Sequence, residues 1–585
     1  MYMNKQEADI INSLLNNTFT NQRELAKDSG HSLGVINKSL KSLIQKGYLN
    51  ENVEITEKAY QLIGDYAPRR AIILAAGYGM RMVPINTETP KGLLEVDGET
   101  LVERLINQLH AVGIDEIYIV VGFMKENYEY LIDEYGVQLV VNDEYALKNN
   151  LHSLKRVLNY LDNSYIIPCD IWCDQNPFSK YELYSWYMVS DLVDKDSNIR
   201  VNRKNELISI DEEMGGNTMI GISYLIKEQA EIVKKRVEEL SINHKYDNSF
   251  WEEALLEKEK MILTAKVVHS SDVVEINTYE QLRELDEHSN QLKTEAIFII
   301  MKCLNVTQEE IKDIVVLKKG MTNRSFLFTC KNKKYIMRIP GEGTGQLINR
   351  EEETDVYCTI KDKKICDEII YINANNGYKI TEFIENARVC NPQNEQDLEL
   401  CMDKLREFHS LKLSVQHSFD MFSLIEFYEG LWSGKKSVYR DYHITKENVM
   451  SLQTYIELHA EEKVLTHIDA VPDNFLILPN NDVRLIDWEY AGMQDPHVDI
   501  AMFCIYALYT REEIDRLIDI YFKKSCSREN RIKIYCYIAV CGLLWSNWCE
   551  YKKQLGVEFG EYSLKQYRYA KEYFRIVMDE LEKGE

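Results

Sequence analysis

The spacing of apolar residues changes twice along the chain and divides it into three regions. In the first region apolar positions recur at the spacing of short amphipathic helices. Short apolar runs then alternate with helical spacing, which is typical of strands and helices in turn. In the last region three short strands precede a long, mainly helical stretch. This pattern predicts three domains, residues 1–66, 67–292 and 293–585.

Residues 1–66 are predicted to form three helices followed by a small wing. Apolar positions at 10–15, 25–26 and 35–44 lie at helical spacing, and Gly47 is expected to end the third helix. Residues 48–55 are interpreted as two short strands joined by a turn. This order of elements resembles a winged helix-turn-helix.

DNA is weighed as a partner of this region but is not favoured. In a DNA-binding protein the third helix enters the major groove, and here it offers polar side chains at Asn37, Lys38, Lys41 and Lys46. Residues 1–66 carry seven Lys and Arg against eight Asp and Glu, which is a poor balance for contact with phosphates. A regulatory or dimerisation module is therefore the favoured interpretation.

Strands and helices alternate through residues 67–292. Four apolar runs predict strands at 71–74, 117–121, 138–141 and 165–167. Helices are expected between them, over 101–111 and 153–161. The alternation predicts a mostly parallel sheet with helices on both faces.

A glycine-containing loop, Ala75-Ala76-Gly77-Tyr78-Gly79-Met80-Arg81, follows the first strand directly, and Pro90-Lys91 comes shortly after it. A strand followed by a glycine loop lets backbone N–H groups approach phosphates. The whole pattern resembles the signature of the NTP-transferase superfamily. This resemblance implies that Ala75, Ala76, Gly77 and Gly79 bind the nucleotide. It also implies that Arg81 holds the β- and γ-phosphates and that Lys91 stabilises charge at the transferred phosphoryl group.

The same resemblance implies a Mg²⁺ site. Asp170 follows an apolar strand at the place where this superfamily keeps a magnesium-binding Asp. Phosphocholine cytidylyltransferases of the bacterial lipopolysaccharide-modification type carry a later Glu-Ile-Asp run, and this chain has Glu275-Ile276-Asn277. Either Asn277 is the second, weaker ligand, or the metal relies more on Asp170 and water. Asn150 lies in a segment that matches the family near the nucleotide.

The glycine loop does not identify the acceptor of the nucleotidyl group, because sugar-nucleotide pyrophosphorylases share the same loop. A quaternary ammonium group is held best over aromatic ring faces. Trp172, Trp186 and Trp251, the last with Glu252 beside it, are the candidates. Each of them is also an ordinary core residue by type. Trp251 is taken as the substrate-binding residue.

Residues His467–Asn474, which read HIDAVPDN, fit the HxDxxxxN catalytic loop of the protein-kinase-like fold. Leu485-Ile486-Asp487 follows at a distance that suits a hairpin. In this pattern Asp469 accepts or orients the proton of the acceptor hydroxyl. Asn474 and Asp487 would hold the Mg²⁺ ions that neutralise the triphosphate.

The strands before this loop are predicted to bind ATP. Lys319–Ser325 forms a strand-turn-strand that would cover the phosphates, with Gly320, Thr322 and Asn323 as nucleotide-binding residues. Arg338 stands where protein kinases have a strand-three lysine, which resembles choline kinases of the bacterial type. Glu353, one of three adjacent acids, is expected to pair with Arg338 from a helix.

Trp488-Glu489-Tyr490-Ala491-Gly492 resembles the stretch that follows the metal-binding Asp in choline/ethanolamine kinases. The resemblance implies that Glu489 and aromatic faces hold a cation that carries a hydroxyl group. Trp488, Trp545 and Trp548 are the expected walls of this cage. Packing in the core of a helical lobe is the alternative for these tryptophans.

The composition limits the partners and the cellular compartment that are expected for this protein. The formal charge of -25 over 585 residues argues against general binding to nucleic acid or anionic membranes. The 13 Cys show no paired CxxC spacing and the sequence opens with no signal peptide, so a reduced, cytoplasmic protein is expected. The apolar stretch 534–545 is too short to span a bilayer and predicts a buried helix, and no membrane segment is expected. The oligomeric state stays open.

Together the resemblances imply two consecutive reactions that need Mg²⁺. ATP would phosphorylate choline, and CTP would then give CMP to phosphocholine, yielding CDP-choline and pyrophosphate. One alternative is the same chemistry on ethanolamine or another amino alcohol. Another is a DNA-binding regulator that senses choline metabolites through degenerate enzyme domains. The fold expected is multidomain α/β and α+β, with a winged helix, a Rossmann-like NTP-transferase domain and a two-lobe protein-kinase-like domain.

Overall fold

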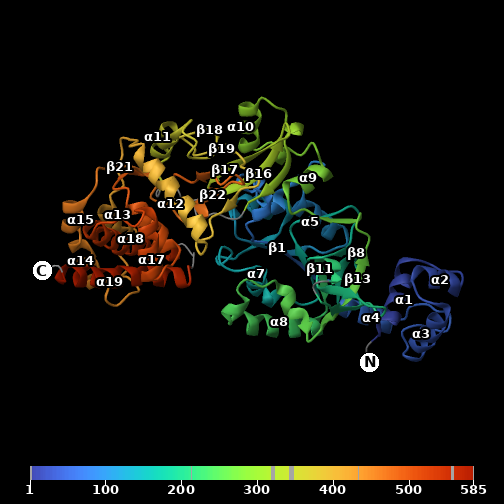
Figure 1. Cartoon of the computed structure of the whole chain (residues 1–585). Helices are drawn as coiled ribbons and strands as arrows, with labels where there is room; N and C mark the ends of the chain where they lie inside the picture. The colour runs from blue at the N-terminus through green and yellow to red at the C-terminus, as the bar shows by residue number, and fades with distance from the viewer. Residues whose placement is uncertain are drawn as a thin grey trace. The chain divides into compact units, whose positions relative to one another are not determined.

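The computed structural model describes residues 3–211, 214–317, 323–341, 348–432, 434–554 and 559–583. The chain divides into two compact units, Met1–Thr294 and Glu295–Glu585. In Figure 1 the first unit runs from blue to green and the second from yellow-green to red. Each unit has its own hydrophobic cores.

The first unit begins with four helices, α1 (Lys5–Asn16), α2 (Gln22–Asp28), α3 (Leu33–Gln45) and α4 (Glu57–Tyr66) (Figure 1). Polar side chains cap their N-termini, including Asn4 in a capping box with Glu7. Gly47 follows α3 at φ +75°, as expected for a glycine that ends a helix. The wing is a single antiparallel bridge between Leu49 and Ile55, and α4 was not predicted.

The winged helix packs directly on the domain that follows it. Leu183, which lies between two strands of that domain, is buried in the core of the winged helix. The Tyr184 hydroxyl donates a hydrogen bond of 2.9 Å to Asp9 Oδ1 on α1. The two parts therefore share one core within the first unit.

The large sheet of the first unit has the strand order β5-β4-β1-β6-β11-β8-β13-β10-β9, with β12 paired to β13. Its strands are β1 (Arg70–Ala75), β4 (Glu116–Val121), β5 (Gln138–Val141), β6 (Ser164–Pro168), β8 (Trp186–Asp194), β9 (Ile199–Val201), β10 (Glu206–Ser209), β11 (Gly216–Leu225), β12 (Leu256–Glu257) and β13 (Lys260–Val268). Helix α5 (Leu101–Ala111) covers one face, and α7 (Asn150–Lys155) and α8 (Lys227–Ser241) cover the other (Figure 1).

The prediction of a mostly parallel sheet was right for only part of this sheet. Strands β5, β4, β1 and β6 are parallel neighbours. Strand β11 is antiparallel to both β6 and β8, whereas β13 runs parallel to β8. Apolar runs predict burial on both faces but not the direction in which a strand is paired.

A two-stranded antiparallel ribbon stands beside the large sheet and carries part of the functional site. It joins β7 (Ile171–Cys173) to β14 (Val273–Glu275), with Glu275 opposite Ile171. The Ile276 N–H donates to the Asp170 carbonyl at 2.9 Å. This pairing brings Asp170 and Asn277 to the same end of the ribbon although they are far apart in sequence.

The second unit begins with a lobe built on an antiparallel sheet in the order β15-β16-β17-β19-β18. Its strands are β15 (Lys312–Val316), β16 (Asn323–Cys330), β17 (Lys333–Pro340), β18 (Ile369–Ile372) and β19 (Lys379–Glu382). Two helices accompany the sheet, α10 (Glu295–Leu304) and α11 (Arg350–Ile360). The three successive strands predicted from the sequence are confirmed as β15, β16 and β17.

The rest of the second unit is mainly helical. Its helices are α12 (Glu395–Ser410), α13 (Met421–Gly430), α14 (Tyr442–Ser451), α15 (Gln453–His459), α16 (Val498–Tyr506), α17 (Arg511–Tyr521), α18 (Arg528–Gln554) and α19 (Glu561–Glu582). Five short strands lie among them, β20 (Arg388–Val389), β21 (Val464–Thr466), β22 (Phe475–Ile477), β23 (Val483–Leu485) and β24 (Gly492–Gln494).

Helix α18 confirms the helix predicted at 534–545. By length and composition it is the one helix in the described part of the chain that could cross a membrane. Its most apolar window is 100% buried inside the protein, against α13, α16 and α19. This burial is that of a core helix.

Candidate functional sites

The glycine loop at the end of β1 is shaped so that other groups can come close to its backbone. Gly79 has φ +59°, and a Cβ there would lie 3.3 Å from Lys91 Cβ, whereas a Cβ at Gly77 would meet nothing within 4 Å. The fully buried Asn86 donates from Nδ2 to the carbonyls of Tyr78 and Gly79, at 3.1 and 3.2 Å. Through these two hydrogen bonds Asn86 holds the backbone of the glycine loop in place. Sequence reasoning missed it, because only the folded chain brings it under the loop.

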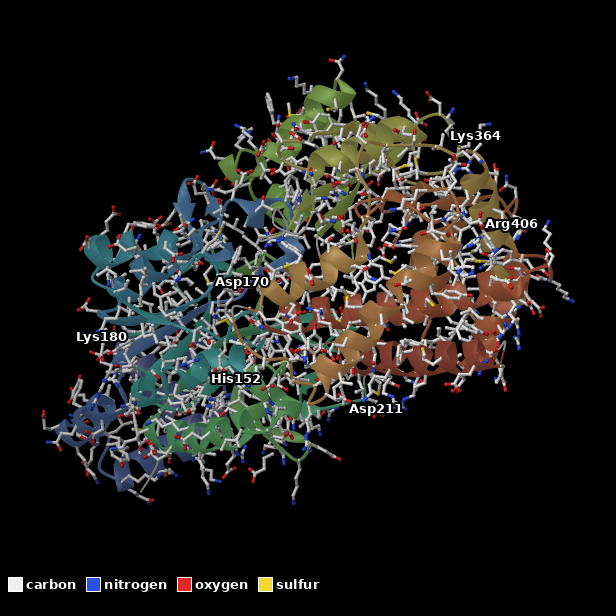
Figure 2. All side chains as sticks on the ribbon, turned by 90° about the vertical axis from the view of Figure 1, so that its left-hand side faces the viewer. His152, Asp170, Lys180, Asp211, Lys364 and Arg406 are labelled. Carbon is white, nitrogen blue, oxygen red and sulfur yellow. The ribbon has the colours of Figure 1, made fainter. Side chains whose placement is uncertain are left out.

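Two cationic side chains and two side chains that carry oxygen atoms lie together next to this loop. Lys91 forms an ion pair with Asp170, and its Nζ donates to Asn277 Oδ1 at 2.7 Å. The Arg81 Nη2 donates to the same oxygen at 2.8 Å. The structure thus brings together all four residues predicted for charge stabilisation and metal binding. Figure 2 labels Asp170 in the first unit.

Asp170 is the residue here that best fits a divalent cation. Its Oδ1 is buried and has no hydrogen-bond partner, which costs free energy unless a ligand or ion supplies one. No cluster of three or more His, Cys, Asp or Glu side chains that could hold a metal occurs among the residues described. A Mg²⁺ ion would therefore draw on Asp170, the amide oxygen of Asn277, and oxygens of substrate and water.

Two acidic side chains, Glu252 and Glu275, lie at or near the β7–β14 ribbon. Burial raises the pKa of Glu252 to about 7, and its Oε1 accepts a hydrogen bond of 2.9 Å from the Tyr187 hydroxyl. The other oxygen, Oε2, is buried without a partner. Burial and the neighbouring Asp170 also raise the pKa of Glu275. A bound cation would relieve this crowding of carboxylates.

In the second unit the predicted catalytic loop lies between β21 and β22. The side chain of Asn474 donates from Nδ2 to Asp469 Oδ2 at 3.0 Å and to the Asp469 carbonyl at 2.9 Å. Burial, with the charges of Asp487 and Glu489, raises the pKa of Asp469 to about 8. The carboxylate and amide oxygens here are of the kind that Mg²⁺ prefers, so Asp487 and Asn474 fit the metal role predicted for them.

A buried aspartate that the sequence analysis left without a role anchors this loop. Asp499, on α16, accepts backbone hydrogen bonds from His467 at 3.1 Å and Ile468 at 2.7 Å. His409 Nε2 lies 2.9 Å from the same carboxylate. Ile468 has φ +69°, which is strained for a β-branched residue. Asp499 therefore holds the strained peptide that precedes Asp469.

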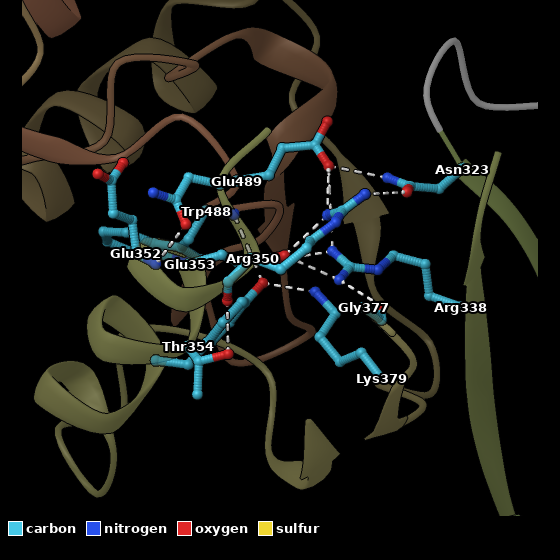
Figure 3. A network of polar contacts seen from close by, with 12 residues as sticks. Asn323, Arg338, Arg350, Glu352, Glu353, Thr354, Gly377, Lys379, Trp488 and Glu489 are labelled. Atoms are coloured by element: carbon cyan, nitrogen blue, oxygen red, sulfur yellow. Dashed lines mark hydrogen bonds and ion pairs between the residues drawn. The ribbon is translucent and has the colours of Figure 1, made fainter. Parts of the chain in front are cut away.

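The predicted pair of Arg338 and Glu353 is present and buried. Both oxygens of Glu353 accept hydrogen bonds from Arg338, the second at 2.9 Å, and Arg338 Nη2 also donates to the Gly377 carbonyl at 3.0 Å. Burial opposes ionisation of Glu353, but its bonds to Arg338 lower its pKa to about 2. We call this pair the clasp (Figure 3). Gly320 and Thr322 lie outside the described residues.

Four aromatic rings lie in a row that runs from Tyr490, after β23, through two residues of α18 to Phe559, just before α19. Tyr490 meets Trp545 edge-on with ring centroids 5.5 Å apart, and Trp548 lies 5.6 Å from Trp545. Phe559 continues the row at 5.1 Å from Trp548. The Tyr490 hydroxyl and the Trp548 indole N–H are buried without a partner. We call these four rings the aromatic row, and its unpaired polar atoms suit a small ligand.

Three protein families match the chain. Residues 71–177 match a "MobA-like NTP transferase domain", residues 314–565 match "Choline/ethanolamine kinase", and residues 3–50 match "Winged helix-turn-helix DNA-binding". The choline-phosphate cytidylyltransferase of Streptococcus pneumoniae is 30% identical over 232 residues, covering 37% of this chain and 97% of that protein. The chain belongs to the choline-phosphate cytidylyltransferase family.

The second unit has relatives of its own. Protein LicA of Haemophilus influenzae is 29% identical over 263 residues, which are 42% of this chain and 96% of that protein. The crystal structure of choline kinase LicA from Streptococcus pneumoniae has 28% sequence identity and a TM-score of 0.43, and covers 48% of this chain and 100% of that chain. The prediction of fused cytidylyltransferase-like and choline kinase-like domains behind a winged helix is confirmed.

The tryptophans proposed for the cytidylyltransferase site lie elsewhere than expected. The Trp251 ring is 1% exposed and packs in the core, while its backbone N–H donates to Asn150 Oδ1 at 2.8 Å. Protein cations already cover the other two, Arg104 over Trp172 at 4.0 Å and Lys266 over Trp186 at 3.9 Å. Residue type alone cannot separate such core rings from a binding site. Asn150 serves to hold Trp251 and thus Glu252.

Aromatic residues that the sequence analysis did not single out lie at the glycine loop instead. The Tyr78 ring is 4.8 Å from Phe123 and 5.2 Å from Tyr145. A Cβ at Gly122 would come within 2.8 Å of the Ala76 carbonyl, so the two loops touch closely. No spacing in the sequence relates these rings, because three separate loops supply them.

One kinase residue differs from expectation, and a second has a partner within the protein. Trp488 is completely buried between His467 and Phe408, and its indole N–H donates to the Leu485 carbonyl at 2.8 Å. It therefore supports the catalytic loop and lines no cage. Asn323, predicted to bind nucleotide, donates from Nδ2 to Glu489 Oε2 at 2.9 Å. Trp545 and Trp548 lie together in the core of the second unit, 6% and 4% exposed, and Lys552 Nζ lies 5.6 Å from the Trp548 ring centroid. Their role as walls of a cage stays a prediction.

Proposed function

We propose that the protein phosphorylates choline with ATP and then transfers CMP from CTP to phosphocholine. The observation that carries this proposal is that each unit assembles its own set of transfer residues. One set surrounds Lys91 and Asp170, and the other surrounds Asp469 and Asn474. The relatives of the two units are named for consecutive steps, so the product of the kinase is the substrate of the cytidylyltransferase.

In the cytidylyltransferase step, a phosphate oxygen of phosphocholine attacks the α-phosphorus of CTP and pyrophosphate leaves. Lys91 and Arg81 donate to one Asn277 oxygen, so the two cations lie side by side. Together they can stabilise the negative charge that develops on the phosphate oxygens. The glycine loop brings backbone N–H groups to the triphosphate. Mg²⁺, when held by Asp170, would neutralise further phosphate charge.

In the kinase step, the choline hydroxyl oxygen attacks the γ-phosphorus of ATP, ADP leaves, and the hydroxyl proton passes to Asp469. Asn474 orients the Asp469 carboxylate through its hydrogen bond to Oδ2. Asp487 and Asn474 would hold Mg²⁺, which screens the triphosphate. Arg338, fixed by Glu353, is placed to meet phosphate oxygens.

Choline is the acceptor that the chemistry of the sites favours. Its quaternary ammonium offers no hydrogen-bond donor, so it needs ring faces and nearby carboxylates. The aromatic row with Glu489 supplies these groups in the kinase, and Glu252 with Glu275 supplies negative charge in the cytidylyltransferase. A primary ammonium such as that of ethanolamine would need several well-placed acceptors.

The cytoplasm is the location we propose, since all thirteen cysteines are free thiols and free thiols suit a reducing compartment. For the winged helix we keep the proposal of a regulatory role. DNA is not favoured because acidic residues outnumber basic ones in residues 1–66.

The test is a coupled assay of the whole protein with choline, ATP, CTP and Mg²⁺ that follows phosphocholine and CDP-choline together. Wild type should make both. Asp469→Ala should make neither from choline but should convert added phosphocholine, and Lys91→Ala should stop at phosphocholine. Ethanolamine and 2-aminoethylphosphonate, the latter the namesake substrate of another relative, are the competing acceptors. A preference for either would refute the assignment to choline.

A further inference from the structure

Arg350 joins the two buried carboxylates of the kinase centre. Its Nη1 donates to Glu353 Oε2 at 2.8 Å and lies 3.4 Å from Glu489 Oε2. Its Nη2 donates to Asn323 Oδ1 at 3.0 Å, and Asn323 in turn donates to Glu489. Figure 3 shows Arg350 at the middle of this network, between the clasp and Glu489. The predicted roles did not include Arg350.

The position is unfavourable for an arginine unless these contacts are needed. Arg350 is the first residue of α11, where a positive charge opposes the helix dipole. Its side chain is only 10% exposed, so the charge has lost most of its hydration. The planar guanidinium offers several donors in a fixed fork and can serve three partners at once, which a lysine ammonium cannot do with the same geometry.

The surrounding backbone is built around this side chain. A Cβ at Gly377 would lie 2.9 Å from Arg350 Nε and 2.6 Å from Pro340 Cγ. The Gly377 carbonyl also accepts the hydrogen bond from Arg338. Glycine at 377 therefore leaves room for Arg350 while its backbone holds the clasp.

We propose, resting on the kinase function proposed above, that Arg350 is a positioning residue that ties Glu489 to the clasp and so makes nucleotide and cationic acceptor bind cooperatively. Arg338 Nη1 lies 4.0 Å from Glu489 Oε2 and Arg350 Nη1 lies 3.4 Å from the same oxygen. Arg350 is therefore the nearer of these two cations, and through Asn323 it also holds Glu489 by a second route. Arg350 and Glu353 share one turn of α11, so nucleotide contacts that fix the clasp also fix the partner of Glu489.

The experiment is a double-mutant cycle in the full-length protein. Steady-state KM and kcat for choline and ATP are measured for Arg350→Gln, Glu489→Gln and the double variant. Arg350→Gln should raise the KM for choline by about tenfold and change kcat less. The double variant should be no worse than Glu489→Gln alone. Arg350→Lys should recover part of the loss, since it restores the charge without the fork.

Two controls separate positioning from a general loss of structure. Glu352→Gln removes an exposed charge from the same helical turn and should leave choline kinetics unchanged. CDP-choline synthesis from added phosphocholine, which uses the other unit, should be equal in all variants. The proposal also requires that choline tightens binding of Mg²⁺–ADP in wild type and no longer does so in Arg350→Gln.

Additive effects of the two substitutions would overturn the proposal, as would an unchanged choline KM in Arg350→Gln. So would a fall in kcat that Arg350→Lys does not relieve. If wild type phosphorylates ethanolamine and not choline, the proposed acceptor fails. The same cycle run with ethanolamine then still decides the role of Arg350.

Discussion

Replacing Asp469 by Asn should stabilise the kinase unit while it abolishes phosphoryl transfer. Burial and two neighbouring acids raise the pKa of Asp469 from 3.8 to about 8. At pH 7 and without bound cations, the native protein therefore keeps a proton that the unfolded chain releases, which corresponds to an upper limit of about 4 kcal/mol of lost stability. Mg²⁺ held by Asp487 and Asn474 would lower this pKa and leave Asp469 ionised for phosphoryl transfer. Asp469 stays partly exposed to water, so we expect Asp469→Asn to gain about 1–3 kcal/mol.

The dependence on pH has a definite sign. Because the native pKa is raised, the penalty is absent below the unfolded value near 3.8, grows as pH rises, and is complete above about 8. The advantage of the Asn variant should therefore increase between about pH 5 and pH 8. Asn also preserves the contact with Asn474, since its Oδ1 can accept the bond that the Asp469 oxygen accepts.

The assay is thermal unfolding in EDTA across this pH range, with the transition of the kinase unit assigned by its shift with Mg²⁺–ATP. The midpoint should rise by about 2–6 °C at neutral pH. Asp473→Asn, at an exposed position of the same loop, is the matched control and should show no such gain. A variant that is less stable than wild type, or a gain that does not change with pH, would refute the reasoning.

Other substitutions test other parts of the two sites. Asn277→Asp should lower the Mg²⁺ concentration that gives half-maximal CDP-choline synthesis by about threefold or more, since a carboxylate binds the cation more strongly than an amide. Trp545→Ala should raise the KM for choline by about tenfold and that for ATP much less, because it removes a ring face of the aromatic row. Gly79→Ala should slow CMP transfer by about tenfold, since the residue has φ +59°. Removal of residues 1–66 should lower the unfolding midpoint of the first unit, because it exposes Leu183.

Much of the fold could be predicted because each strand of the first half of the large sheet is a short apolar run. The runs at 71–74, 117–121, 138–141 and 165–167 became β1, β4, β5 and β6. Strand direction in the second half could not be predicted, because the direction depends on how long connections cross the sheet. Helix α4 was missed although Thr56 caps it and Ala59 and Ile63, one turn apart, are buried on one face.

The charged residues of both sites were predictable and the aromatic ones largely were not. Lys91, Asp170, Asp469 and Arg338 stand in motifs whose spacing reflects local chain geometry. By contrast, nothing local distinguishes Trp488, which supports a loop, from Trp545, which joins the aromatic row. Both are buried in the same core, so they differ in their partners, which tertiary packing alone decides.

The position of the winged helix bears on what it can regulate. The segment that enters its core, around Leu183, leads back through residues 174–182 to β7, and β7 begins directly after Asp170. Glu182 in this segment is buried and accepts hydrogen bonds from Tyr165 and Trp186, each at 2.9 Å. A displacement of α1 would therefore pull on a segment that is bonded to the central sheet and continuous with a candidate metal ligand. A winged helix tethered by a flexible linker would have no such connection, so coupling to the cytidylyltransferase is the role that this attachment favours.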